Sequence, residues 1–578
     1  MLSRLALIIR RAMPLLAVLV VFAAFSGRGA DAAGPVTARQ HMVVTANPHA
    51  TAAGLAMLQQ GGSAIDAAIA AMMVLNLVEP QSAGIGGGAF MLHYDSASRA
   101  VTSYDGRETA PLSATESLFL GADGEPLGFF DAVVGGRSVG VPGLVAMLAL
   151  AHEDHGRLPW ADLFQPAIRL ARDGFAVSPR LHGLIAGDSH LHRDPAARAY
   201  FYDSAGQPLA VGSTLRNLPF ADTLAAIASD GPAAFYGGAI AGDIVARVQA
   251  PPTGLAGDLT MADFTAYEAK ERAAVCGPYR QWRVCGMGPP SSGGLTSLMI
   301  LGQLAAFDLA ALGPDSADAM HLLIEAERRA YADRGLYMAD ADFVPVPVAG
   351  LLDPGYLARR AATIDPTASS GPVEPGVPGD QGRLWQNGQS LEQPATTHLS
   401  IVDGHGNAVS LTASVESAFG SRLFVRGFLL NNQLTDFSFR PDQDGQPVAN
   451  RVEGGKRPRS SMAPTMVFDQ DSGRLVLVVG SPGGSRIIAY VTQAIIAVLD
   501  WGLDAQSAVA MGHVVNRNGV TDLEEGTDAA ALAEALQAMG HEVSLRSMNS
   551  GLHAIVLLPD GTLAGGADPR REGVAAGD

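Results

Sequence analysis

The sequence is poor in the residues that mark several large classes of protein. Aromatic residues make up 6% of the 578-residue chain, and only two cysteines are present. Two cysteines alone make a poor metal site, because structural zinc sites take four ligands. The 39 Lys and Arg residues are outnumbered by 57 Asp and Glu residues, so the formal net charge is −18. A chain this acidic, with no basic stripe, repels phosphate backbones, and we therefore expect no nucleic-acid partner.

Long apolar runs are also missing. The N-terminal run from Pro14 to Phe25 is well short of the ~20 residues that cross a bilayer. It follows Arg4, Arg10 and Arg11 and precedes the small-residue site Ala30–Ala32. A basic start, a short apolar run and an A-x-A site are typical of a secretory signal peptide. We therefore predict that residues 1–32 are a cleaved signal peptide, and that the mature protein is secreted or periplasmic with no membrane span.

What the sequence does contain is typical of a large, loop-rich globular enzyme. Apolar residues make up 48% of the chain, and there are 67 glycines and 35 prolines. This composition is neither disordered nor fibrous, and the length is enough for a large core or two domains.

The two cysteines lie in a short segment, Val275–Cys285, whose pattern predicts two strands around a turn. An oxidising compartment and an even number of cysteines favour a disulfide between Cys276 and Cys285. Two buried thiols are the alternative.

Hydrophobic periodicity divides the chain into helices and strands. Helices are predicted in residues 48–80, with a capping-box-like start at Ser63 and Asp66, and in the stretches 143–175, 316–342 and 486–499. Alternating residues predict strands in the stretches 89–106, 398–403 and 408–414, and a further strand is predicted in the apolar stretch 475–479. Helices before and after strands predict a layered α/β sandwich.

Several long motifs, in one order along the chain, resemble the γ-glutamyltransferase family of the N-terminal-nucleophile (Ntn) hydrolase superfamily. The longest begins with Thr396-Thr-His-Leu-Ser and runs to Gly420. The resemblance covers most of the mature chain, and its other motifs are Val78–Phe90, Asp105–Pro111, Asn431–Asp436, Lys456–Met462, Gly480–Arg486 and Ala567–Arg571.

The resemblance implies a four-layer αββα sandwich that two fragments of one chain form jointly. The precursor of this family cuts itself immediately before its nucleophile, which is Thr396 in this sequence. The bond between Ala395 and Thr396 would then separate a large subunit, residues 33–395, from a small catalytic subunit, residues 396–578. The two subunits would remain together as a heterodimer.

The chemistry of a terminal threonine explains why such an enzyme needs no separate base. Before the cut, the Thr396 hydroxyl can attack the preceding carbonyl and form an ester that water hydrolyses. After the cut, Thr396 carries an α-amine with an unperturbed pKa of about 7.7–8.0, so the amine can act as general base for the hydroxyl. Ser414 matches a second hydroxyl that bonds to the nucleophile.

The resemblance also implies the residues that hold the reacting groups. Gly483 and Gly484 match the oxyanion-hole pair, and their place between a strand and a helix lets backbone N–H groups face an anion. A γ-glutamyl group carries both a carboxylate and an ammonium group. The residues implied for its carboxylate are Arg107, Ser460 and Ser461, and those implied for its ammonium group are Glu416, Gln433 and Asp436.

Three features depart from the family pattern. Ser414 stands where Thr is commoner, and a serine preserves the hydrogen bond. Glu416 stands where Asn is common, and its carboxylate still attracts an ammonium group. The loop from Ser438 to Gly455 is short and contains only one aromatic residue, Phe439, where some members carry an aromatic-tipped lid. The balance between transfer and hydrolysis is therefore left open.

The implied function is a γ-glutamyl transferase/hydrolase that cleaves glutathione and related γ-glutamyl amides through an ester on Thr396. Water or an amino acid or peptide accepts the acyl group, and neither a cofactor nor a metal is expected. The alternative within the superfamily is an acylase for glutaryl or cephalosporin-type amides, or for poly-γ-glutamate. Two acids at the ammonium subsite favour the γ-glutamyl group.

Rivals from other classes have weaker support. The segment Gly84–Ala89 fits the dinucleotide pattern G-x-G-x-x-A, with Asp105 at a suitable distance, but it follows a predicted helix and leads into a strand. His152 and His155 are three residues apart rather than the four of a metalloprotease motif, and His190-Leu-His192 has no evident third ligand. A non-catalytic relative is disfavoured because the predicted catalytic residues are all present.

Overall fold

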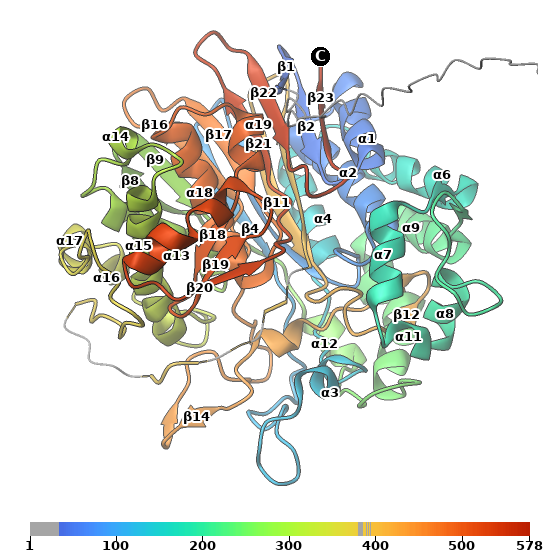
Figure 1. Cartoon of the computed structure of the whole chain (residues 1–578). Helices are drawn as coiled ribbons and strands as arrows, with labels where there is room; N and C mark the ends of the chain where they lie inside the picture. The colour runs from blue at the N-terminus through green and yellow to red at the C-terminus, as the bar shows by residue number, and fades with distance from the viewer. Residues whose placement is uncertain (1–33, 380–384, 389, 391, 394) are drawn as a thin grey trace, which may run out of the picture. The chain divides into compact units, whose positions relative to one another are not determined.

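The structure is a computed structural model that describes residues 34–379, 385–388, 390, 392–393 and 395–578. The predicted signal peptide, residues 1–32, lies outside the described residues. In the described part of the chain, two seven-stranded antiparallel sheets form the centre of the molecule (Figure 1).

The first sheet contains the strand that follows Thr396. Its strands, in spatial order, are β23 (Val574–Gly577), β2 (Met42–Thr45), β10 (Thr397–Val402), β11 (Ala408–Ser414), β3 (Gly88–Asp95), β4 (Ala100–Gly106) and β7 (Lys270–Ala273). The second sheet has the order β1 (Val36–Ala38), β22 (Leu563–Ala567), β21 (His553–Leu557), β17 (Leu475–Gly480), β16 (Thr465–Asp469), β9 (Trp282–Gly286) and β8 (Val275–Tyr279).

Alternation along the strands explains how the two sheets pack. In β17, Val478 joins the buried cluster that also contains Met42 and Leu92 of the first sheet. Its neighbours Leu477 and Val479 join a different cluster, formed with helices on the other side of the second sheet. Because successive strand residues face opposite ways, one face of each sheet meets the other sheet and one face meets helices. The prediction of a four-layer αββα sandwich is confirmed.

The longer helices flank the two sheets (Figure 1). Helix α2 (Ala64–Val78) packs against β10 and β11, and all of its residues are buried, which is typical of a helix that is apolar on every side. The other longer helices on its side are α1 (Pro48–Gln59), α4 (Leu144–His155), α6 (Gln165–Asp173), α9 (Leu218–Asp230) and α11 (Ala239–Gln249). The second sheet is covered by α13 (Gly293–Leu304), α15 (Ala317–Tyr337), α17 (Pro354–Ala361) and α18 (Ile487–Leu499).

The remaining elements complete the described fold. The remaining helices are α3 (Phe129–Val133), α5 (Trp160–Leu163), α7 (Pro179–Gly187), α8 (Pro195–Phe201), α10 (Pro232–Tyr236), α12 (Met261–Ala266), α14 (Leu309–Leu312), α16 (Val348–Leu351), α19 (Ala505–Ala510), α20 (Asp528–Ala531) and α21 (Ala533–Ala538), with 3-10 turns η1 (Leu191–Arg193), η2 (Gln433–Asp436) and η3 (Gly484–Arg486). Small sheets pair β5 (Phe175–Ala176) with β6 (Thr214–Leu215), β12 (Phe424–Val425) with β13 (Phe428–Leu429), β14 (Asp442–Gln443) with β15 (Gln446–Pro447), and β18 (Val514–Asn516), β19 (Thr521–Glu524) and β20 (Val543–Arg546) with one another.

The predicted local elements are present. Ser63 and Asp66 form the capping box at the start of α2, with the Ser63 backbone N–H donating to Asp66. Cys276 and Cys285 face each other in the β8–β9 hairpin and form the predicted disulfide. Among the described residues, no helix is long and apolar enough to cross a membrane.

Each sheet contains strands from both sides of the Ala395–Thr396 bond. In the first sheet, β2 lies between β23 and β10, and β3 extends the sheet beyond β11. In the second sheet, β1 and the pair β9–β8 flank strands that come from after Thr396. Residues before and after this bond therefore share one hydrogen-bonded framework.

Candidate active site

Thr396 immediately precedes β10, where the first sheet is hydrogen-bonded on both sides of the strand. The antiparallel pairing with β11 sets Thr397 opposite Ala413, so Ser414 at the end of β11 lies next to Thr396. The segment Gly84–Gly88 runs from the end of α2 into β3, the reverse of a dinucleotide-binding loop. A Cβ on Gly87 would lie 2.2 Å from the Ser414 carbonyl oxygen, so these glycines allow close packing against the site.

Two hydroxyl groups meet at the carbonyl group that precedes Thr396. Thr396 Oγ1 donates to the Ala395 carbonyl oxygen at 2.5 Å, and Ser414 Oγ donates to the same oxygen at 2.9 Å. The two hydroxyl oxygens are 3.1 Å apart. The Glu416 backbone N–H donates to Ser414 Oγ at 2.8 Å and fixes its position. The bond between Ala395 and Thr396 is intact, so the structure is that of an uncut chain.

A buried ion network holds the other side of Thr396. Arg571 donates from Nη1 to the Thr396 carbonyl oxygen at 2.8 Å and lies 3.7 Å from Glu79 Oε2. The Thr397 hydroxyl also donates to Glu79, at 3.1 Å. Burial lowers the pKa of Arg571 to about 9, with Arg180 also lowering it and Glu79 raising it. Sequence reasoning assigned no role to Arg571 or Glu79, although both lie within motifs of the family pattern.

The glycine pair lies between β17 and α18, as expected. Gly483 has φ 145° and Gly484 has φ 58°, conformations that favour glycine. A Cβ on Gly483 would lie 2.6 Å from the Tyr490 ring, and a Cβ on Gly484 would lie 2.7 Å from the Gln393 carbonyl oxygen. The segment upstream of the intact bond therefore passes directly over Gly484.

A small cavity of about 20 Å³ lies next to Thr396. It brings together most of the predicted site residues with the segment before Thr396, and its lining is Glu392, Gln393, Thr396, Ser414, Glu416, Gln433, Asp436, Ser460, Ser461, Met462, Gly484 and Ile487. Arg107 and Gly483 do not belong to this lining.

Two buried acids give one end of the cavity its charge. Burial raises the pKa of Asp436 to about 6, although Arg107 lowers it. Burial and the nearby Asp436 raise the pKa of Glu416 well above its usual range. Gln433 donates from Nε2 to Asp436 at 2.8 Å, and Glu416 accepts the Gln393 backbone N–H at 2.9 Å. Two acids and an amide in this arrangement suit an ammonium group.

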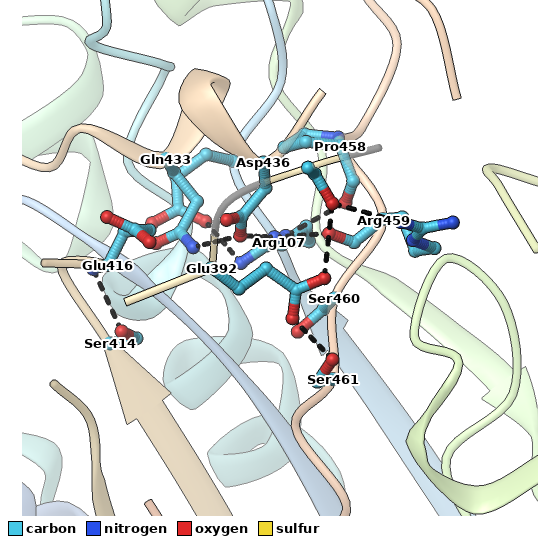
Figure 2. A network of polar contacts seen from close by, with 12 residues as sticks. Arg107, Glu392, Ser414, Glu416, Gln433, Asp436, Pro458, Arg459, Ser460 and Ser461 are labelled. Carbon is cyan, nitrogen blue, oxygen red and sulfur yellow. Dashed lines mark hydrogen bonds and ion pairs between the residues drawn. The ribbon is translucent and has the colours of Figure 1, made fainter. Parts of the chain in front are cut away.

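Arg107 lies directly behind Asp436 (Figure 2). Its side chain is fully buried, and Nη2 donates to Asp436 Oδ2 at 2.5 Å and to the Arg459 carbonyl oxygen at 2.9 Å. Nε donates to the Pro458 carbonyl oxygen at 3.1 Å, while Nη1 has no hydrogen-bond partner among the described residues. Nη1 lies 3.8 Å from Glu108 Oε2. Arg107 therefore holds Asp436 in place, and one of its nitrogens makes an ion pair but no hydrogen bond.

Ser461 bonds to the segment that precedes Thr396. Its hydroxyl donates to the carboxylate of Glu392, and Arg334 on α15 bonds to both Glu392 and Ser461. Figure 2 shows Glu392 reaching from the upstream segment to Ser461. Ser460 accepts the Met462 backbone N–H at 3.1 Å. Sequence analysis did not identify Arg334, because its stretch was recognised only as a helix.

The histidines suggest no metal centre. Among the described residues, the one group with suitable spacing is His321, Glu325 and His541. His321 instead bonds to the Asp365 carbonyl oxygen and to His541, at 2.7 Å each. Glu325 pairs with Arg328, whose Nη2 lies 3.4 Å from His541, so a guanidinium already supplies the positive charge.

The histidines singled out in the sequence are engaged in packing. His152 bonds to the Leu158 carbonyl oxygen at 2.9 Å, and His155 stacks on His93. His190 stacks on Phe130. None of these contacts favours metal binding.

The loop from Ser438 to Gly455 carries the small β14–β15 hairpin. Its aromatic residue, Phe439, stacks on Phe119 with ring centres 4.6 Å apart and does not line the cavity beside Thr396. The described loop therefore places no aromatic side chain in the cavity beside Thr396.

Comparisons with known proteins show which proteins the chain resembles. Residues 50–578 match the family model described as Gamma-glutamyltranspeptidase. The chain is 38% identical over 556 residues to a glutathione hydrolase proenzyme of Escherichia coli K12, covering 93% of this chain and 92% of that protein. It is 37% identical to an Acylase ACY 1 proenzyme of Pseudomonas sp. V22, covering 93% and 94%. The crystal structure of a cephalosporin acylase from Bacillus halodurans superposes with a TM-score of 0.83 at 28% identity, covering 97% of this chain and 99% of that one.

Proposed function

The chain belongs to the gamma-glutamyltranspeptidase family, and we propose that Thr396 is the nucleophile with which it first cuts itself and then transfers γ-glutamyl groups. It is an enzyme of the γ-glutamyltransferase/glutathione hydrolase type, made as a precursor and processed into two subunits. The observation that carries the proposal is the meeting of the Thr396 and Ser414 hydroxyls at the Ala395 carbonyl group.

Self-cleavage would begin at this carbonyl group. Thr396 Oγ1 attacks the Ala395 carbonyl carbon, the C–N bond breaks, and the hydroxyl proton passes to the departing nitrogen. The resulting ester between Ala395 and Thr396 is hydrolysed by water, which leaves a carboxylate on Ala395 and restores the hydroxyl. Ser414 donates to the carbonyl oxygen, where negative charge develops, and so stabilises the transition state.

Acyl transfer would use the same hydroxyl after the cut. The new α-amine of Thr396 takes the hydroxyl proton, Oγ1 attacks the γ-carbonyl of the donor, and the donor's amine leaves with a proton. The γ-glutamyl ester is then transferred to water or to the amine of an amino acid or peptide. The backbone N–H groups of Gly483 and Gly484, at the start of the turn into α18, are proposed to bind the oxyanion.

The charges in the cavity favour a γ-glutamyl donor. Asp436, Glu416 and Gln433 are proposed to bind its ammonium group, and Ser460, Ser461 and Arg107 to bind its carboxylate. The pKa of Glu416 is raised well above its usual range and that of Asp436 to about 6, so Asp436 carries the negative charge near neutral pH. One negative charge beside one ammonium group is an electrically balanced arrangement.

A glutaryl or cephalosporin-type acylase is the second candidate, since relatives with that name match nearly the whole chain. A glutaryl group has no amine, so Asp436 and Glu416 would face an apolar methylene, and the Asp436 side chain would keep, among the described residues, only Arg107 and Gln433 as partners. Polar groups buried against an apolar group without a hydrogen-bond partner are costly, so the two acids favour the γ-glutamyl group.

The proposed subunits are residues 33–395 and 396–578, after loss of a signal peptide at residues 1–32. Export to the periplasm or the medium is proposed from that signal alone. The heterodimer is supported by the presence, in each sheet, of strands from both sides of the proposed cut.

The test compares the wild-type protein with a Thr396→Ala variant. Wild-type protein should give two chains, the smaller beginning at Thr396 by mass spectrometry, and should hydrolyse γ-glutamyl-p-nitroanilide, with glycylglycine measuring transfer. Thr396→Ala should remain one chain without activity. Thr397→Ala is the matched control and should still be cut, because its hydroxyl faces Glu79. Cleavage of Thr396→Ala at Ala395 would refute the proposal, and equal rates with glutaryl-p-nitroanilide would favour the acylase.

A further inference from the structure

The carboxylate partner of Arg334 belongs to a segment that the cut sets free. The Arg334 side chain is 7% exposed, and its Nη2 bonds to Glu392 Oε1 and, at 2.6 Å, to Ser461 Oγ. Its Nε donates to Ser292 Oγ at 2.8 Å. Among the described residues, Glu392 is the one carboxylate paired with Arg334. The guanidinium thus belongs to helix α15, while its counter-ion lies four residues before Thr396.

The upstream segment occupies the space that a donor needs. Glu392 and Gln393 line the cavity beside Thr396, and the Gln393 N–H donates to Glu416. Both residues also cross Gly484, since a Cβ there would lie 2.7 Å from one carbonyl oxygen and 2.9 Å from the other. A donor reaches Thr396 only when this segment has moved away, and Arg334 then loses Glu392.

A buried guanidinium without a counter-ion is costly, and here a second one lies nearby. Burial and the charge of Arg334 lower the pKa of Arg459 to about 9, and Glu392 raises it. Removing Glu392 therefore leaves a positive, partly dehydrated site beside the nucleophile. A carboxylate from the substrate is the group that this site fits best, because a guanidinium and a serine hydroxyl both donate to carboxylate oxygens.

We propose that Arg334 and Ser461 bind the carboxylate of the γ-glutamyl group in the mature enzyme, and that Glu392 occupies this position in the precursor. The inference rests on the proposed function and adds to it a residue that determines specificity. Arg107 already bonds to Asp436, and only its Nη1 makes no hydrogen bond among the described residues. Arg334 would supply a second guanidinium for the same carboxylate. The precursor's own glutamate thereby keeps the site closed to donors until the cut is made.

The experiment compares donors with and without the carboxylate. The probes are γ-glutamyl-p-nitroanilide and 4-aminobutyryl-p-nitroanilide, which keeps the amine but lacks the carboxylate, together with L-glutamate and 4-aminobutanoate as competitive inhibitors. Arg334→Met should lower kcat/KM for the γ-glutamyl donor, and raise the inhibition constant of L-glutamate, by roughly 10- to 100-fold, as expected for a lost charged hydrogen bond. The values for the two amines without the carboxylate should change by less than about threefold. Arg334→Lys, which keeps the charge, should lie between.

The controls separate this inference from folding and from the proposed function. The double variant Arg334→Met/Glu392→Met removes both charges from the precursor, so it should fold and be cut, and its mature form differs at the site only in residue 334. Arg440→Met removes an exposed arginine that pairs with Glu125 and should behave as wild type. Equal losses for ligands with and without the carboxylate, or no loss for either, would overturn the inference. Failure of the wild-type enzyme with the γ-glutamyl donor would instead refute the proposed function.

Discussion

At the scale of single residues, the site depends on groups that approach one carbonyl oxygen. Thr396 and Ser414 both donate to the Ala395 oxygen, and Arg571 donates to the next carbonyl along the chain. The peptide between Ala395 and Thr396 therefore lies between fixed donors on each side. In the proposed self-cleavage, these donors would hold the peptide for attack by the Thr396 hydroxyl.

The acid that faces the ammonium group predicts a pH dependence. Burial raises the pKa of Asp436 to about 6, and Glu392 also raises it in the uncut chain. Asp436 is ionised above this pKa and takes up a proton below it, so ammonium binding should weaken as the pH falls through 6. Loss of Glu392 in the mature enzyme should move this transition somewhat lower.

The measurement must separate the titration of Asp436 from that of the Thr396 α-amine. Reaction of a γ-glutamyl or a glutaryl donor requires the Thr396 α-amine in the same way, but only the γ-glutamyl donor carries an ammonium group of its own. The ratio of their kcat/KM values should therefore fall several-fold between pH 7 and pH 5. Asp436→Asn should lower the ratio at neutral pH and remove its pH dependence. A ratio that stays constant in the wild-type enzyme would show that Asp436 does not bind the ammonium group.

Residues within sequence motifs could be predicted, while their buried partners could not. Thr396, Ser414, Glu416 and Asp436 lie in motifs, and the structure brings them to one cavity. Arg334 lies on a helix more than 60 residues before Thr396, and only the tertiary fold brings it to Glu392. Its pairing follows from how the layers pack, which periodicity along one chain does not determine.

At the scale of elements, the strand–turn–helix from β17 to α18 determines which backbone can pass over the site. A short apolar run predicted β17, and a longer apolar run predicted α18, because both patterns are local. The role of Gly484 as a crossing point required the structure, since the crossing chain comes from residues 392–393. The close approach leaves no room for a side chain in the uncut protein.

Gly484→Ala should therefore slow self-cleavage by at least about tenfold. The new Cβ would lie 2.7 Å from the Gln393 carbonyl oxygen, so the upstream segment must shift and carry Ala395 away from Thr396. Gly502→Ala is the matched control, because Gly502 also has positive φ, 65°, but nothing within 4 Å. The fraction of cut chain is followed by gel after synthesis. Equal rates for both variants would mean that the upstream segment does not lie over Gly484.

At the scale of the whole molecule, the layers were predicted more fully than their assembly. Helix and strand patterns indicated a sandwich, and the family resemblance gave its four layers. The order of strands was not predictable, because pairs such as β1 with β22 join residues over 500 positions apart. Such contacts depend on the complete hydrophobic core rather than on local pattern.

The disulfide should stabilise the molecule without affecting its chemistry. It links residues nine positions apart in β8 and β9, at the edge of the second sheet. Removing a cross-link of this length should lower the free energy of unfolding by about 2–3 kcal/mol. Cys276→Ala/Cys285→Ala in the uncut Thr396→Ala background should show this loss in urea denaturation. In the wild-type background, the pair of substitutions should leave the extent of self-cleavage unchanged.

Because each sheet contains strands from both sides of the proposed cut, the cut changes how the protein can fold. Before the cut, closing the sheets is an intramolecular event that depends on one chain finding its own partners. After the cut, the same pairing between β2 and β10, or β9 and β16, requires two chains to meet. Refolding then becomes second-order and dependent on concentration, while unfolding still begins from one particle. A mature molecule that unfolds therefore regains its fold only when two chains meet again. Its lifetime is set by its rate of unfolding rather than by its rate of refolding.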